Sequence, residues 1–146
     1  PTSQRVLRIP AAGGELEDLF EGDSQKVALD GHRILYDKSQ QTGIFERSLD
    51  GDIASNAETR IIEDYVGPLG LIPGKSGIFY VGRDASRKPS ALRFYDYSLR
   101  KSFDLAPPPA STVPVLTLSP DGSRLILERL SRFTPELTRM EFRRGN

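Results

Sequence analysis

The sequence has no cysteine and no tryptophan, and its 146 residues include a single histidine, His32. Without cysteine there is no disulfide framework, no thiolate zinc site and no cysteine nucleophile. One histidine excludes a two-histidine metal site within the chain and leaves only one imidazole that could act as a base. These absences exclude disulfide-stabilised scaffolds and the metal and thiol chemistries that need these side chains.

Net charge is absent as well, because 20 Lys and Arg balance 20 Asp and Glu. Binding to a nucleic-acid backbone needs clustered positive charge, so we expect no nucleic-acid partner. No apolar run approaches the length of a membrane-spanning helix, so we expect no direct membrane insertion. The chain begins at Pro1 without a signal-peptide pattern, and we interpret it as a processed chain or a piece of a longer protein.

Turn-forming residues are plentiful, with 13 Gly and 11 Pro, and helical periodicity is missing. The stretch nearest to a helix, 15–21, is too short. Short runs rich in β-branched or aromatic residues, bounded by Gly, Pro, Asp or Ser, predict strands instead. These runs lie at 6–9, 33–36, 77–81, 92–97 and 124–127.

Two kinds of hairpin alternate along the chain. In the first kind, two strands flank a polar turn, and its copies begin near residues 5, 43, 91 and 136. In the second kind, two apolar strands flank a tight turn, and its copies span 27–36, 69–80 and 116–127. Two hairpins every ~40–45 residues is the period of a four-stranded propeller blade, and a sandwich does not need this recurrence.

The sequence therefore predicts an all-β fold, a β-propeller segment of about three four-stranded blades. The approximate repeat units are 5–42, 43–90 and 91–135, with a final strand over 136–146. Propellers typically close with about 4–8 blades, so we expect this segment to be part of a larger ring. The open strand edges at both ends then need a cover, either the remaining blades, a protein partner or a second copy of the chain.

The residues Leu118-Ser119-Pro120-Asp121-Gly122, followed by the apolar strand 124–127, carry a resemblance to a known family. They resemble the signature of TolB-like, WD40-like bacterial propeller repeats, and residues 8–15 are similar to the strand and turn that follow it. The resemblance implies the C-terminal blades of a sensory or docking propeller, such as those attached to winged-helix regulators or membrane-linked kinases. It also implies a periplasmic or other extracytoplasmic location, although the composition fits the cytoplasm equally well.

The residues we single out are structural, and we predict no catalytic residue, no cofactor and no metal ion. A tight hairpin turn needs positive φ, which Asp-Gly supplies, and proline rigidifies the entry of such a turn. The predicted turn residues are Asp30, Gly31, Ser119, Pro120, Asp121 and Gly122.

Four patterns that suggest chemistry are weaker than their structural interpretations. The loop ending in Gly74-Lys75-Ser76 lacks the phosphate-loop spacing and precedes a strand, so we interpret it as a hairpin turn. Ser24 has no complete triad, and His32 follows a turn. The acidic residues of 15–23 and Asp50 lack a calcium-loop pattern. Pro107–Pro109 is interpreted as a stiff connection between strands.

We therefore expect a non-enzymatic propeller module that recognises a protein or another ligand through its loops. The alternative is the gating propeller of a prolyl-oligopeptidase-like peptidase whose catalytic domain lies elsewhere. The parent gene discriminates between them, because an α/β-hydrolase domain after Asn146 would favour the peptidase.

Overall fold

The computed structural model describes residues 5–21, 23–27, 31–38, 41–51, 57–65, 70–107, 115–131 and 134–141. All regular structure in these ranges is β-strand, which confirms the prediction of an all-β fold. The strands are β1 (Arg5–Arg8), β2 (Glu17–Glu21), β3 (Asp23–Val27), β4 (Arg33–Lys38), β5 (Gln41–Ser48), β6 (Thr59–Ile62), β7 (Leu71–Pro73), β8 (Gly77–Arg83), β9 (Pro89–Asp96), β10 (Lys101–Ala106), β11 (Val115–Leu118), β12 (Arg124–Ser131) and β13 (Thr134–Glu141).

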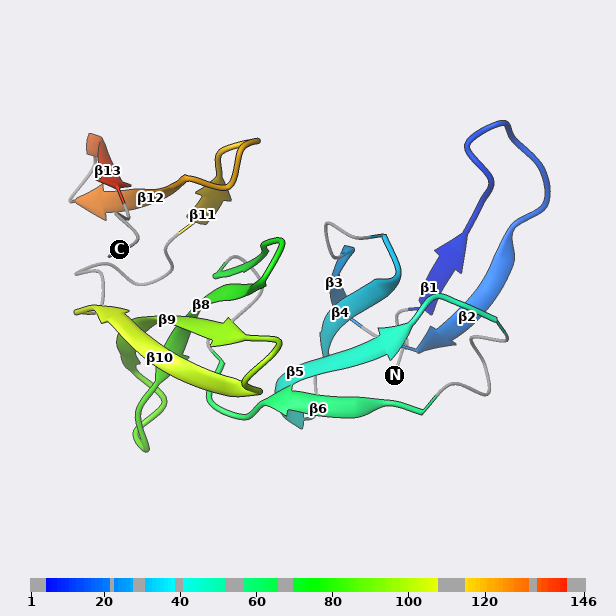
Figure 1. The fold of residues 1–146 in the computed structure, drawn as a ribbon, viewed down its shortest axis with the longest axis horizontal. Helices are drawn as coiled ribbons and strands as arrows, with labels where there is room; N and C mark the ends of the chain where they lie inside the picture. Colours follow the sequence, from blue (N-terminus) through cyan, green and yellow to red (C-terminus); the bar gives the residue numbers. More distant parts are fainter. Residues whose placement is uncertain are drawn as a thin grey trace. The chain divides into compact units, whose positions relative to one another are not determined.

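Each strand pairs only with its neighbours in sequence, and every pair is antiparallel (Figure 1). The sheets run β1-β2, β3-β4-β5-β6, β7-β8-β9-β10 and β11-β12-β13. The expected hairpins are therefore present up to β12, whereas of the copy that begins near residue 136 only the strand β13 lies within the described residues. The chain divides into two compact units, Pro1–Glu63 and Asp64–Asn146.

The sheets straddle the boundaries of the predicted repeat units. The sheet β3–β6 takes strands from 5–42 and 43–90, and the sheet β7–β10 takes strands from 43–90 and 91–135. Each four-stranded sheet thus joins one hairpin of the second kind to the following hairpin of the first kind. The described sheets are separate meanders, and none of them closes on itself.

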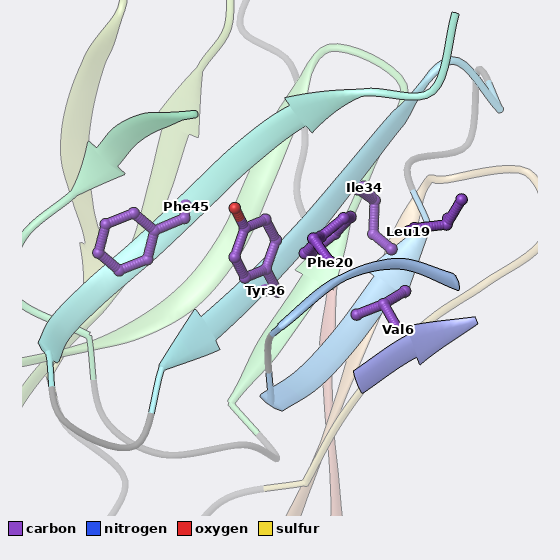
Figure 2. Packing of buried hydrophobic residues seen from close by; sticks show 6 residues of the cluster. All are labelled: Val6, Leu19, Phe20, Ile34, Tyr36 and Phe45. Carbon is purple, nitrogen blue, oxygen red and sulfur yellow. The ribbon is translucent and has the colours of Figure 1, made fainter. Parts of the chain in front are cut away.

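In the first unit, the β1-β2 hairpin and the sheet β3–β6 share an apolar cluster (Figure 2). Its members are Val6, Leu19, Phe20, Ile34, Tyr36 and Phe45, all buried. A β-bulge makes this packing possible, because Val6 pairs with Phe20 while Leu7 pairs with Asp18. Leu19 is the extra residue of the bulge, so Leu19 and Phe20 are both buried although they are consecutive.

In the second unit, one face of the sheet β7–β10 packs against the sheet β11–β13. The shared cluster contains Val81 and Leu92 from one sheet and Leu116, Leu125 and Leu127 from the other. The cross-strand pairs Val81–Leu92, Leu116–Leu127 and Leu118–Leu125 supply this core. Alternation along each strand places these residues on one face.

Both four-stranded sheets bury apolar side chains on both faces. In the sheet β3–β6, Ile34 and Phe45 belong to the cluster of Figure 2, whereas Leu35 and Ile44 point to the opposite face and are also fully buried. In the sheet β7–β10, the second face carries buried Ile78, Tyr80, Leu71, Ala91 and Tyr95.

Candidate functional site

The predicted turn at Ser119–Gly122 is a compact hydrogen-bonded loop between β11 and β12. The Gly122 amide donates to the Ser119 carbonyl (2.8 Å), and Gly122 has a φ of +71°. The Ser119 hydroxyl donates to Asp121 (2.5 Å) and accepts from the Arg124 amide (2.9 Å). Asp121 also accepts from the Ser123 amide and hydroxyl. These bonds lower the pKa of Asp121 to about 2, and the bond from the Ser119 hydroxyl contributes most.

Two more turns of the second unit use an aspartate in the same way, and the sequence analysis did not single out either aspartate. Asp84 accepts from the Ser86 amide (2.8 Å) and hydroxyl (2.7 Å), and Asp96 accepts from the Ser98 amide (2.8 Å) and hydroxyl (2.6 Å). Hydrogen bonds lower the pKa of each aspartate, and the bond from the serine hydroxyl contributes most. The signal that could have found them is the Asp-x-Ser spacing shared with Asp121-Gly122-Ser123.

The earlier predicted turn is seen only in part. Gly31 has a φ of +74°, as a tight turn requires, and precedes β4. Asp30 lies outside the described residues. Pro120 is exposed and sits at the turn that begins at Ser119.

A buried tyrosine of the first unit lies at the centre of a polar network. The Tyr36 hydroxyl donates to Glu58, which also accepts from the Lys38 ammonium (2.6 Å) and lies 3.6 Å from Arg47. The Tyr36 ring stacks on Phe45, and the Arg47 guanidinium covers the Phe20 ring. Burial, and then the bond to Glu58, raise the pKa of Tyr36. Burial by itself would raise the pKa of Glu58, but the hydrogen bonds from Lys38 and Tyr36 outweigh burial and lower this pKa.

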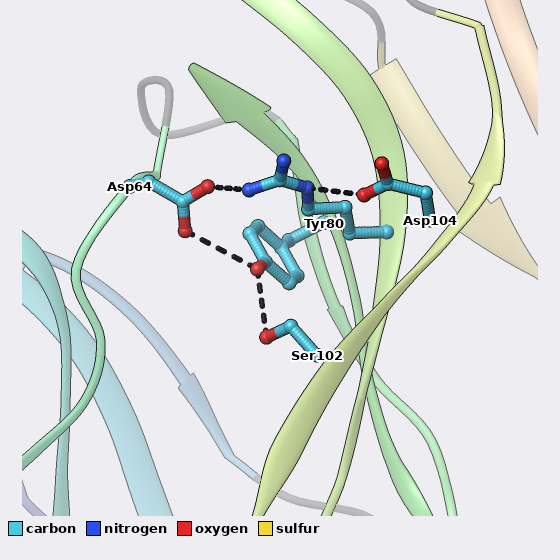
Figure 3. A network of polar contacts seen from close by, with 5 residues as sticks. Asp64, Tyr80, Ser102 and Asp104 are labelled. Atoms are coloured by element: carbon cyan, nitrogen blue, oxygen red, sulfur yellow. Dashed lines mark hydrogen bonds and ion pairs between the residues drawn. The ribbon is translucent and has the colours of Figure 1, made fainter. Parts of the chain in front are cut away.

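A second network occupies the equivalent place in the second unit (Figure 3). The Tyr80 hydroxyl is hydrogen-bonded to the Ser102 hydroxyl (2.9 Å) and, at a longer distance, to the Asp64 carboxylate (3.3 Å). Arg93 bridges Asp64 and Asp104, the latter at 2.6 Å. Register explains the arrangement, because Tyr80, Arg93 and Asp104 are direct cross-strand partners on β8, β9 and β10. Burial raises the pKa of Tyr80.

Both networks hold segments of the chain in place. A tyrosine with a raised pKa stays protonated at neutral pH, so it donates a hydrogen bond and is neither a base nor a nucleophile. Each network fixes a segment that leads into an edge strand, Glu58 before β6 and Asp64 before β7. The Arg83 amide bonds to the Asp64 carbonyl (2.7 Å) and reinforces the second tie.

The remaining sequence candidates lie in separate places. Gly74-Lys75-Ser76 connects the antiparallel strands β7 and β8, which confirms a hairpin turn. The His32 Nδ1 lies 3.1 Å from Asp50, and both side chains are about two-thirds exposed. Asp23 and Ser24 belong to strand β3, whereas Gly22, Asp52 and Pro108–Pro109 lie outside the described residues.

Two acidic residues of the first hairpin, Glu17 and Asp18, form ion pairs across the strands. Arg5 pairs with Asp18 (2.7 Å) and Arg8 pairs with Glu17 (2.6 Å), with all four side chains about half exposed. Exposed ion pairs of this kind contribute little to stability, because solvent screens them. Among the described residues, no group of three or more His, Asp or Glu side chains could hold a metal ion.

The outer strand β10 carries the exposed apolar side chains of the second unit. Phe103 and Leu105 alternate along β10 and are 39% and 36% exposed, and Leu99 in the preceding turn is 64% exposed. The Lys101 ammonium lies 5.7 Å from the Phe103 ring centroid. Aromatic residues are enriched at protein interfaces.

A scan against models of known protein families, a search of curated proteins and a search of solved structures each return no match for the chain. The resemblance to TolB-like repeats therefore stays a prediction. No helix within the described ranges is long and apolar enough to cross a membrane.

Proposed function

We propose that this chain is a β-propeller segment and serves as a non-catalytic module that recognises a protein partner. The observation that supports the proposal is the burial of both faces of two successive four-stranded meanders, with Leu35 and Tyr36, neighbours on β4, both at 0% exposure. In a sandwich, each antiparallel sheet buries one face and leaves the other in water. Blades of a propeller stack radially, so an internal blade is covered on both faces.

The state of the polar side chains supports a module without catalysis. Tyr36 and Tyr80 are held in their protonated form, and Arg93 and Lys38 are paired with carboxylates. His32, the one imidazole, is exposed and contacts an exposed aspartate. A nucleophile needs an adjacent base that a third group orients, and the described residues do not form such a set.

The exposed side of β10 is the surface we assign to the partner. It combines Leu99, Phe103 and Leu105 with the cation of Lys101. A protein partner would bury the Phe103 ring and the two leucines, and a polar rim would surround them. Among the described strands β13 is the edge of its sheet, and such an edge is a second place where another chain can add a strand.

The experiment compares the wild-type chain with the double variant Phe103→Ser/Leu105→Ser and with the control Leu16→Ser. Leu16 is 65% exposed and lies in the first unit. Each immobilised chain is used to capture proteins from extracts, and a captured protein is then purified and its affinity measured. We expect the double variant to weaken binding at least about tenfold, since truncation of interface anchors costs ~2 kcal/mol or more, while the control binds as wild type does.

Equal binding by both variants would remove β10 from the proposal. Turnover of ester or peptide substrates by the purified chain, lost on mutating Ser24 or His32, would contradict the non-catalytic assignment. An experimental structure in which either four-stranded sheet exposes one complete face to water would contradict the propeller.

A further inference from the structure

The exposed large apolar side chains of the described residues lie in only two places. The first group, which we call the hairpin patch, lies on the β1-β2 hairpin and consists of Leu7, Ile9 and Leu16. The second group, the β10 patch, lies on β10 and the turn before it and consists of Leu99, Phe103 and Leu105. Single exposed apolar residues need no explanation, but apolar side chains gathered in a patch mark a surface that another molecule covers.

The hairpin patch lies at the end of the β1-β2 pair. Leu7 lies one position before the Arg8–Glu17 pair, and Ile9 and Leu16 lie one position beyond it on the two arms of the hairpin. This end of the hairpin projects away from the sheet β3–β6 of its own unit (Figure 1). The buried cluster of the first unit contains none of the three side chains, which are half to two-thirds exposed.

The hairpin patch is surrounded by an excess of negative charge. Residues 5–21 hold four carboxylates and two guanidiniums. Both guanidiniums form ion pairs across the strands. The two carboxylates in excess belong to Glu15 and Glu21, and exposed Glu15 directly precedes Leu16. A surface that covers this patch therefore gains from positive charge.

The β10 patch carries the opposite charge. Exposed Arg100 and Lys101 precede Phe103 in the chain, and the Lys101 ammonium lies 5.7 Å from the centroid of the Phe103 ring. The neighbouring carboxylate of Asp104 is paired with Arg93 on β9, which leaves the two cations in excess. The β10 patch is thus apolar and basic, whereas the hairpin patch is apolar and acidic.

We propose that the hairpin patch of one copy of this chain binds the β10 patch of a second copy. Apolar side chains then cover one another and the two excess charges attract. Both elements are also sheet edges among the described strands, so main-chain hydrogen bonds can add to the contact. Each copy contributes a different patch, so association can continue from copy to copy. The inference rests on the proposed function, because it names a second copy as a partner of β10.

The test measures the mass of the chain by analytical ultracentrifugation from about 10 µM to about 1 mM, the range of weak interfaces. We expect the average mass of the wild-type chain to rise with concentration. Phe103→Ser/Leu105→Ser removes one patch and Leu7→Ser/Leu16→Ser removes the other, so each variant alone should associate at least about tenfold more weakly. Circular dichroism checks that both variants fold.

A mixture of these two variants provides the sharpest result. The first variant keeps its hairpin patch and the second keeps its β10 patch, so one contact remains possible between them. We expect the mixture to form a dimer with one copy of each variant and no larger species. A mixture that stays monomeric, or that associates no better than either variant alone, would overturn the proposal.

A charge variant tests the same contact without removing apolar surface. Arg100→Glu should weaken association of the wild-type chain at least about threefold, and the further change Glu15→Arg should restore it. Arg87→Glu is the matched control, because Arg87 and Arg100 are both exposed turn residues of the second unit with positive φ. Equal weakening by Arg87→Glu and Arg100→Glu would contradict a contact at the β10 patch. If the serine variants fail to fold, these charge variants carry the test.

The outcomes separate this inference from the proposed function. A wild-type chain that is monomeric at every concentration would overturn the inference, whether the contact is absent or closes within one chain. Such a monomer could still capture another protein through β10, and the proposed function would stand. Turnover of a substrate would contradict the proposed function and would leave the measured masses unchanged.

Discussion

The sheets β3–β6 and β7–β10 share a strand order and a buried tyrosine at one position of the second strand, yet they surround that tyrosine with opposite charge. Residues 33–36 read Arg-Ile-Leu-Tyr and residues 77–80 read Gly-Ile-Phe-Tyr. Around Tyr36, two cations converge on the single carboxylate of Glu58. Around Tyr80, the single cation of Arg93 bridges two carboxylates.

The contrast separates what the fold demands from what it leaves free. Both sheets need a large side chain that fills the interior and whose hydroxyl reaches the segment before an edge strand. The sign of the surrounding charge is free, provided that each buried polar group finds a partner. The equivalent position in β12 is Leu127, which is buried in the apolar cluster of its unit. A tyrosine there is thus one solution among several.

Truncation of the two tyrosines should give the largest effect and should affect both sheets alike. Both rings are fully buried, so Tyr36→Ala and Tyr80→Ala should each lower the free energy of unfolding by ~3–5 kcal/mol. Urea unfolding followed by circular dichroism measures the change. A loss below ~1 kcal/mol in either variant would show that the two tyrosines are not equivalent.

Removal of the hydroxyls alone should reveal the difference between the sheets. Tyr36 donates to the Glu58 carboxylate, whereas the shorter bond of Tyr80 joins it to the neutral Ser102 hydroxyl and its bond to the Asp64 carboxylate is long, at 3.3 Å. A hydrogen bond to a charged group contributes ~1.5–3 kcal/mol and one between neutral groups ~0.5–1.5 kcal/mol. Tyr36→Phe should therefore destabilise the chain more than Tyr80→Phe in the same urea titration. The opposite order would contradict the assignment of partners.

The sequence predicted the strands and hairpins well and the networks not at all, for physical reasons. Consecutive apolar residues that follow a glycine predict strands such as β8 and β12. Strand β3, Asp-Ser-Gln-Lys-Val, is mostly polar, and pairing with β4 defines it. Tyr80 and Ser102 lie 22 residues apart, so only the cross-strand register brings them together. The bulge at Leu19 breaks the period of two that sequence reasoning depends on.

We expect acid to destabilise the sheet β7–β10 by protonating an aspartate in one of its turns. Hydrogen bonds lower the pKa of Asp96 below its unfolded value of ~3.9, so the stabilisation is present above about pH 4 and is lost as the pH falls further. Asp96→Ala should lower the melting temperature at pH 7, and the difference from wild type should shrink below pH 4. The parallel variant Asp121→Ala should lose its difference as the pH falls from about 4 to about 2. Differences that are as large at pH 2 as at pH 7 would exclude this origin.

The smallest expected change in stability distinguishes the turns between the third and fourth strands of the two four-stranded sheets. The sheet β3–β6 has Gly51 in this turn at a φ of +71°, whereas the sheet β7–β10 has Arg100 in this turn at a φ of +49°. A side chain in this left-handed region is strained by ~1–2 kcal/mol, and glycine removes the strain but makes the unfolded chain more flexible. Arg100→Gly should therefore stabilise the chain by ~0.5 kcal/mol in urea unfolding. Gly51→Ala should destabilise it, although an added Cβ would meet no atom within 4 Å, because only the backbone conformation opposes it. If both variants lose stability, the strain at Arg100 is compensated by contacts of its side chain, and the two turns differ in more than their glycine.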